Sequence, residues 1–401
     1  MNYLTKLDLN FQDQTSYLEG FHRSGWSFVM KELKQLEAKS GGILCDTYVD
    51  RTFHWKKGTP FTKEWCGFVH HTFDTTFSSY NCVELLKNKA FQDSLPLCKG
   101  LFVFTNELKS RWELELSALS FDIPVVKLDH PTETPDTVFT LEKYNANSNK
   151  KLVQVGAWLR NVYSIFALNN GNGPLILEDG EKLAKCALQG PFMEQYFKPS
   201  NFFASLFQDR YKTQAEKKVK AVSITTNRIL SPNGELPIQV TSETDNEDDN
   251  DDNDDGICRG GMSRDYMCRD ALRLNKYVLG SLKMLEKYDN SVSVLPFATN
   301  SQYDTLLSEN IVFVDLVDAG AVNTLIECIV RCTPIVITRL PATIDVLGED
   351  YPLFFDALSD IHLTQAKITS AYNYLVSMDK TFLTGNNFLD ELTQSTLYKS
   401  L

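Results

Sequence analysis

The sequence lacks several features that mark particular classes of protein. No apolar run approaches the roughly 18 residues that a membrane-spanning helix needs. The first residues, MNYLTKLDLNFQDQ, contain neither the basic nor the apolar region of a signal peptide. The nine cysteines are an odd number and form no CxxC pair, which argues against a zinc ribbon or a thioredoxin-type site. We therefore expect a cytoplasmic protein with reduced thiols and no transmembrane segment.

An excess of positive charge is also missing. Lys and Arg number 40 against 52 Asp and Glu, which gives a net charge of −12. Nine of the acidic residues lie within 243–255, so the rest of the chain carries a net charge of only −3. Without a basic footprint, we expect no nucleic-acid partner. The Asp/Asn-rich stretch 241–256 has almost no apolar residues, so we expect a disordered insertion there and no metal site.

The apolar content is sufficient for two cores. The chain has 401 residues, of which 43% are hydrophobic, with 25 Phe and 16 Tyr, and this length favours two domains. Short apolar runs alternate with helical patterns, which is typical of an α/β domain. The expected strands of a first domain, residues 1–145, are 42–46, 66–70, 101–105 and 123–128.

A polar stretch, 144–151 (YNANSNKK), fits a linker and precedes a new strand, LVQVG at 152–156. We expect a second α/β domain to occupy 146–360. The remaining residues, 361–401, are expected to form C-terminal helices that cross back to the first domain, with 361–378 as the candidate crossing helix.

The most informative segment is 310–353, which has the pattern of a β-α-β unit. Apolar runs at 311–314 and 334–338 (PIVIT) flank a helical pattern that places Leu325, Ile326 and Ile329 on one face. Two buried parallel strands joined by a helix bind ligands at their carboxyl ends. The segment therefore predicts a binding site between the first strand and the helix.

The residues at that helix start suit a nucleotide sugar. Gly320 gives conformational freedom before the helix, whose first amides can hold a phosphate. Asp318, Asn323 and Thr324 surround this start, and Asn323 and Thr324 are also ordinary helix-capping residues. Glu327, one turn further, is placed to accept hydrogen bonds from ribose hydroxyls, although an exposed carboxylate paired with Arg331 is the simpler alternative.

This segment resembles the donor-binding motif of GT-B glycosyltransferases, in which a glutamate is followed by a helix end, a small residue, proline and a strand. The sequence NTLIECIVRCTPIVITRLPATIDVLGEDYPLFF is similar to segments of glycosyltransferases of bacteria and large DNA viruses. The resemblance implies two Rossmann-like domains facing across a cleft, and transfer of a sugar from a nucleotide-sugar donor to an acceptor hydroxyl. The lack of a membrane anchor favours a soluble glycan, a protein or a cytosol-facing glycolipid as the acceptor, and we expect no metal cofactor.

One position departs from that family pattern. Retaining enzymes of the E-x7-E type have a first glutamate eight residues before the second, and Ala319 stands there. A catalytically degenerate GT-B scaffold that binds a sugar or a protein partner is therefore the alternative function. A nicotinamide-dependent oxidoreductase is a weaker alternative, because no GxGxxG follows any expected strand.

Cations are needed beside the diphosphate leaving group, where negative charge develops. Arg160 follows the strand 152–156 and, by the resemblance, faces the cleft between the domains. Arg339, just after PIVIT, is the best-placed second cation, with Lys185 and Arg331 as alternatives.

The acceptor side is expected in the first domain. His70 and His71 are two of only six histidines and end an expected strand, so one of them is a candidate to hydrogen-bond the donor or to act as general base. Asp74 is a weaker candidate base. The segment 22–25 (HRSG) is a possible phosphate- or acceptor-contacting loop, but residues 4–11 before it make a poor strand pattern.

Overall fold

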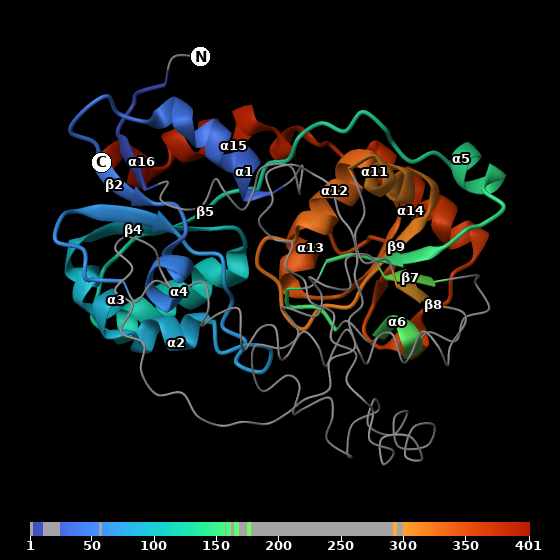
Figure 1. Cartoon of the computed structure of the whole chain (residues 1–401), viewed down its shortest axis with the longest axis horizontal. Coiled ribbons are helices and arrows are strands. Elements are labelled where there is room, and N and C mark those ends of the chain that lie inside the picture. Colours follow the sequence, from blue (N-terminus) through green and yellow to red (C-terminus); the bar gives the residue numbers. More distant parts are fainter. Residues whose placement is uncertain are drawn as a thin grey trace, which may run out of the picture.

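The computed structural model describes residues 3–10, 25–55, 58–156, 158–161, 164–167, 175–177, 292–294 and 300–401. These residues form two α/β bodies, each built on one parallel sheet (Figure 1). The predicted fold class is thereby confirmed. The predictions for 241–256, for Lys185 and for most of the loop at 22–25 lie outside the described residues.

The first sheet has five strands in parallel. They are β1 (Leu7–Asn10), β2 (Ile43–Asp46), β3 (Trp65–Phe68), β4 (Cys98–Val103) and β5 (Val125–Lys127). Their spatial order follows the chain order, so the described part of this sheet contains no point at which the order reverses. β3 is buried along its whole length because helices cover both faces of the sheet. β1 forms although its segment is a poor strand pattern.

Two groups of helices cover the first sheet. On one face α1 (Trp26–Leu33) and η2 (Lys34–Leu36) pack beside two C-terminal helices, α15 (Gly385–Gln394) and α16 (Thr396–Ser400) (Figure 1). The other face buries side chains of α2, α3, η4 and α4. These elements span Cys82–Lys87, Lys89–Ser94, Leu95–Leu97 and Asn106–Ala118, and the short helix η3 (Arg51–Trp55) follows β2.

The second sheet is doubly wound. Its strands are β6 (Leu152–Gln154), β7 (Leu175–Leu177), β8 (Val292–Val294), β9 (Ile311–Val314), β10 (Ile335–Thr338) and β11 (Phe354–Phe355). All pairs are parallel, in the order β11-β10-β9-β6-β7-β8. The order reverses between β6 and β9, and ligands of such sheets bind at the carboxyl ends of the strands beside this reversal.

The helix of the predicted β-α-β unit is α12 (Asn323–Arg331), between β9 and β10, so that unit is confirmed. Leu325, Ile326 and Ile329 are buried in the core of the second domain, as their spacing predicts. The other described helices of this domain are α5 (Leu141–Ala146), α6 (Ser164–Ala167), α11 (Asn300–Glu309), α13 (Pro341–Leu347), η5 (Leu358–Asp360) and α14 (Gln365–Ser377).

The chain passes between the domains twice. Phe139 and Tyr144 are already part of the second core, so the first passage ends before residue 145. Helix α14 also packs into the second core, through Ile368, and does not cross back as was expected of 361–378. The return instead follows α14: η6 (Thr381–Leu383) leads to α15 and α16, which pack on the first sheet. No helix within the described residues has the length and apolar character to cross a membrane.

Candidate functional site

The switch point of the second sheet brings two loops together at the carboxyl ends of β6 and β9. The amide of Asn161 donates to the carbonyl of Asp315 at 2.9 Å, and the amide of Val317 donates to the carbonyl of Leu159 at 2.8 Å. Arg160 and Leu316 pair as an isolated antiparallel bridge. The loop after β6 is therefore fixed against the loop after β9, and Arg160 has a defined position.

The Arg160 guanidinium lies beside the start of α12. Its Nη2 donates to Thr324 Oγ1 at 3.2 Å, and its Nη1 donates to the Trp158 carbonyl at 2.8 Å. Only 8% of the residue is exposed. Gly156, with φ of +81°, makes room for it, because a Cβ there would lie 2.7 Å from the Arg160 Cζ. A buried cation thus stands at the switch point of the second sheet.

Asp315 links the ends of three neighbouring strands. Its carboxylate accepts from Asn161 Nδ2 at 3.0 Å and from Thr338 Oγ1 at 3.2 Å, so β6, β9 and β10 are joined. Burial raises the pKa of Asp315, while hydrogen bonds from Ser164, Thr338 and Asn161 oppose that rise. These contacts indicate that the Asp315 carboxylate holds the ends of the three strands together.

The amino terminus of α12 is not capped by a side chain. The residue at its N-cap is Val322, which makes no side-chain capping hydrogen bond. Asn323 and Thr324 are the first two helical residues, so neither takes the capping role that was the alternative for them. A helix start of this kind attracts anions through its amides and its dipole. Together with Arg160, it forms a positive site suited to a phosphate group.

Glu327 is buried, with 2% of its surface exposed, so the alternative of an exposed carboxylate is wrong. Its Oε2 accepts a hydrogen bond from the hydroxyl of Tyr303 on α11. Arg331 does not pair with its carboxylate: Nη1 donates to the Glu327 carbonyl at 3.2 Å, and Nη2 bonds Asp304 Oδ1 at 3.0 Å. Arg331 therefore joins α11 to α12.

Asp318 and Gly320 lie in the loop that precedes α12. The Asp318 carboxylate accepts from the Ala319 amide at 2.8 Å, and Ala319 itself is buried in the core. A Cβ on Gly320 would lie 2.9 Å from the carbonyl oxygen of His70 in the first domain. Gly320 thus permits close contact between the domains, a reason for glycine that the sequence alone did not indicate.

Arg339 is not brought to the switch point. It is exposed, its guanidinium lies over the ring of Phe354 at 4.8 Å, and its Nη1 donates to the Glu349 carbonyl at 3.4 Å. Phe354 belongs to β11, which lies on the other side of β10 from β9. In this structure Arg339 therefore points toward the sheet edge and away from Arg160.

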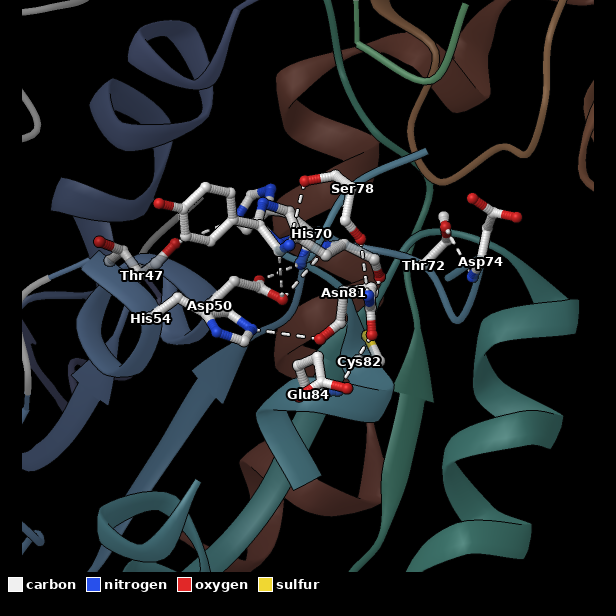
Figure 2. Close-up of polar contacts among 12 residues, drawn as sticks. Thr47, Asp50, His54, His70, Thr72, Asp74, Ser78, Asn81, Cys82 and Glu84 are labelled. Atoms are coloured by element: carbon white, nitrogen blue, oxygen red, sulfur yellow. Dashed lines mark hydrogen bonds and ion pairs between the residues drawn. The ribbon is translucent and has the colours of Figure 1, made fainter. Parts of the chain in front are cut away.

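In the first domain, His70 and His71 follow β3, and the backbone turns there so that both of their amides face the carboxylate of Asp50. The His70 amide donates to Asp50 Oδ2 at 2.7 Å, and the His71 amide donates to Oδ1 at 3.3 Å. Figure 2 shows these contacts. The His71 Nδ1 lies 3.7 Å from Asp50 Oδ1, and Asp50 is fully buried. Asp50 thereby fixes the turn that carries both histidines.

The same turn is tied to the start of α2. The Cys82 amide donates to the Thr72 carbonyl at 2.8 Å, and its thiol lies 3.1 Å from the His71 carbonyl oxygen. Asn81 caps α2 by accepting from the Glu84 amide at 3.0 Å, and its own carbonyl lies 3.1 Å from His54 Nε2 (Figure 2). The histidine turn is therefore held from both sides.

Burial disfavours the charged form of both imidazoles. Burial lowers the pKa of His70 to about 4, and Asp50 opposes this only in part. Burial also lowers the pKa of His71, again against the effect of Asp50. His70 Nε2 lies 3.2 Å from the Thr47 carbonyl, which can only accept, so this nitrogen carries the ring proton. A pKa near 4 makes His70 a weak base and better suited to hydrogen bonding.

Asp74 is engaged in a turn. Its Oδ2 accepts from the amides of Thr76 at 3.0 Å and Phe77 at 2.7 Å, and its Oδ1 accepts from the Thr76 hydroxyl at 2.8 Å. These contacts are those of an Asx turn. They explain the residue structurally, without reference to a substrate.

The histidine turn and the switch point meet. The His71 ring stacks on Trp158 with centroids 4.9 Å apart, and Phe77 contacts the same indole at 5.3 Å. A further link joins the Asn106 amide to Asp345 Oδ2 at 3.1 Å. His71, Gly320 and Arg160 are therefore gathered at one junction. In the described part of the chain, no group of three His, Cys, Asp or Glu residues is placed to hold a metal ion.

Three residues in and around the candidate site were missed from the sequence. Asp50 follows the predicted strand 42–46 in the run DTYVD, and a carboxylate just after a buried strand was the available signal. For Trp158, the only signal in the sequence was its position two residues before Arg160. Tyr303 reaches Glu327 through the packing of α11 on α12, which no local pattern indicates.

No protein-family model matches the chain, and a search of the curated proteins finds no match. Among solved structures, a sucrose-phosphate synthase from Thermosynechococcus elongatus matches 91% of this chain and 72% of its own at 10% identity, with a TM-score of 0.47. The N-terminal domain of a Candida albicans trehalose-6-phosphate phosphatase matches 92% and 76% at 12% identity, with a TM-score of 0.44. The lipopolysaccharide outer core galactosyltransferase WaaB matches 94% and 79% at 10% identity, with a TM-score of 0.42. Similarity at this level assigns neither a substrate nor a residue role to this chain.

Proposed function

We propose that this protein is a GT-B glycosyltransferase that moves a sugar from a nucleotide-sugar donor to an acceptor hydroxyl without a metal ion. The observation that carries the proposal is the buried Arg160 beside the uncapped start of α12, at the switch point of a doubly wound sheet. Two α/β domains in contact through the carboxyl ends of their strands agree with the GT-B plan that the sequence resembles.

In this proposal the donor diphosphate binds between Arg160 and the first amides of α12. Negative charge grows on the diphosphate as the bond to the sugar breaks, and a fixed cation beside helix amides stabilises that charge. Asp318, Gly320, Asn323 and Thr324 line the helix start. Glu327 accepts from the ribose of the donor, and Arg339 is the least favoured contact because it points toward β11.

The first domain supplies the acceptor side. His71 is the preferred general base of the three candidates, because the Asp50 carboxylate near Nδ1 stabilises the imidazolium that proton transfer would form. His70 is assigned hydrogen bonding rather than proton transfer, since its pKa is about 4. Asp74 ranks last, because its carboxylate already serves a turn.

Thermal unfolding with UDP-, GDP-, ADP- and CMP-sugars, with and without EDTA, tests the donor site. A ligand at 100 times its dissociation constant stabilises the fold by about 2.7 kcal/mol. We expect one nucleotide family to stabilise the protein equally with and without EDTA, and Arg160→Ala to lose the effect. Arg111→Ala, which removes an arginine paired with Glu115 on α4, is the control and should respond as wild type.

Donor consumption then separates catalysis from binding. The alternative function, a degenerate scaffold that binds a sugar or a protein partner, predicts stabilisation by a nucleotide sugar that is never consumed, whatever acceptor is supplied. Release of the nucleoside diphosphate that depends on both Arg160 and His71 supports the enzyme. No stabilisation across the panel contradicts the donor site itself.

A further inference from the structure

Helices α11 and α12 are joined by a buried ion pair. Arg331, only 1% exposed, bonds Asp304 Oδ1 through Nη2 at 3.0 Å, and its guanidinium lies 6.0 Å from the centroid of the Tyr303 ring. Its Nη1 also donates to the Glu327 carbonyl. Removal of Asp304 would leave the buried Arg331 guanidinium without its ion pair, which is strongly destabilising. The first turn of α11 is thus fixed beside α12.

This arrangement brings the Tyr303 hydroxyl to the carboxylate of Glu327. The hydroxyl donates to Oε2, and Glu327 is 2% exposed. The last torsion of a glutamate side chain is soft, and a hydrogen bond from a neighbouring hydroxyl narrows the range of rotations that its carboxylate samples. A hydrogen bond to one oxygen fixes that rotation, and with it the direction in which the other oxygen can accept.

We propose that Tyr303 is a positioning residue that orients Glu327 toward the ribose hydroxyls of the donor nucleotide. The inference rests on the proposed function and adds a specificity determinant to it. A site built to accept from a hydroxyl rejects an analogue that lacks it, because the buried carboxylate then loses that hydrogen bond. The protein therefore discriminates ribose from 2′-deoxyribose, and Tyr303 sets how strongly.

The test measures dissociation constants of UDP, GDP, ADP and CDP, and of their 2′-deoxy counterparts, with the full chain by calorimetry. Hydrogen bonds to charged groups are strong enough that we expect wild type to prefer the ribonucleotide by about tenfold or more. Tyr303→Phe should reduce that preference to about threefold or less, mainly by weakening ribonucleotide binding. Tyr374→Phe, which removes a hydroxyl bonded to the Leu347 carbonyl in the same domain, should keep the full preference.

A double-mutant cycle separates positioning from a general structural role. In a Glu327→Gln background, Tyr303→Phe should not change the ribose preference further, because the carboxylate it orients is gone. An unchanged preference in Tyr303→Phe, or no preference in wild type, overturns the inference while leaving diphosphate binding intact. If no nucleotide binds wild type, or if Arg160→Ala binds equally well, the proposed donor site fails instead.

Discussion

The indole of Trp158 lies stacked on the imidazole of His71, with ring centroids 4.9 Å apart and planes inclined by 30°. Trp158 follows β6 of the second domain, and His71 follows β3 of the first. The pair therefore joins the loop that carries Arg160 to the turn that is held by Asp50. We therefore expect a change in either loop to alter the packing of the other domain.

Replacement of Trp158 tests this contact. Aromatic pairs contribute about 0.5–1.5 kcal/mol beyond the area they bury, so Trp158→Ala should lower the midpoint of thermal unfolding and slow donor consumption. Trp158→Phe keeps a ring beside His71 and should retain most of both. Equal unfolding midpoints and rates for Trp158→Ala and wild type would show that the stack does not couple the domains.

Gly156 and Gly41 form a matched pair for substitution by alanine. Both have positive φ, +81° and +70°, so alanine costs each about 1–2 kcal/mol of backbone strain. A Cβ at Gly41 meets nothing within 4 Å, whereas one at Gly156 would lie 2.7 Å from the Arg160 guanidinium carbon. Both variants should unfold at lower temperature, and only Gly156→Ala should also weaken nucleotide binding. Unchanged nucleotide binding in Gly156→Ala would show that Arg160 does not contact the donor.

Thr324 holds the Arg160 guanidinium through its hydroxyl, at 3.2 Å. Thr324→Val keeps the shape and removes the acceptor, so we expect nucleoside diphosphate binding to weaken by about tenfold, the size of one hydrogen bond to a charged group. Thr393→Val, which removes a hydroxyl bonded to the Leu389 carbonyl on α15, is the control. Calorimetry that finds equal affinities in both variants would contradict the assignment.

His130 should make the protein less stable in acid. Burial lowers its pKa to about 4 in the folded state, below the ordinary value of 6.5, so the unfolded chain binds more protons between these values. Its contribution to stability is complete above pH 6.5 and is lost as the pH falls toward 4. Denaturant unfolding at pH 7 and pH 4.5 should show a loss about 2 kcal/mol smaller in His130→Gln than in wild type. An equal loss in both would mean that His130 is accessible to protons in the fold.

The second domain was the more predictable part of the fold. Strands β9 and β10 are short apolar runs, and α12 has apolar residues at helical spacing, so periodicity alone located the segment from Ile311 to Thr338. The strand pattern at 152–156 likewise placed Arg160 just after the first strand of this domain, while its role as a donor contact stays a prediction. These features depend on residues near one another in the sequence, so the local sequence pattern is enough to predict them.

The rest depends on tertiary packing. β1 was a poor strand pattern, yet it forms because Leu7 and Leu9 alternate toward the core while Asp8 stays exposed at the edge of the sheet. The contact between Tyr303 and Glu327 joins two helices through residues 24 positions apart in the sequence. The sequential order of the first sheet likewise follows from strand pairing, which local propensity does not encode.

The packing of α15 and α16 on the first sheet makes that domain a composite of two segments that lie far apart in the sequence. Leu397 occupies the space beside Gly100 in β4, where a Cβ would lie 2.3 Å from its Cδ2, and Tyr3 donates to Asp390 Oδ1. During synthesis, the domain that leaves the ribosome first therefore lacks part of its core until residues 385–400 emerge. The described core of the second domain ends at Leu383, so those residues are all translated before the segment that completes the first core.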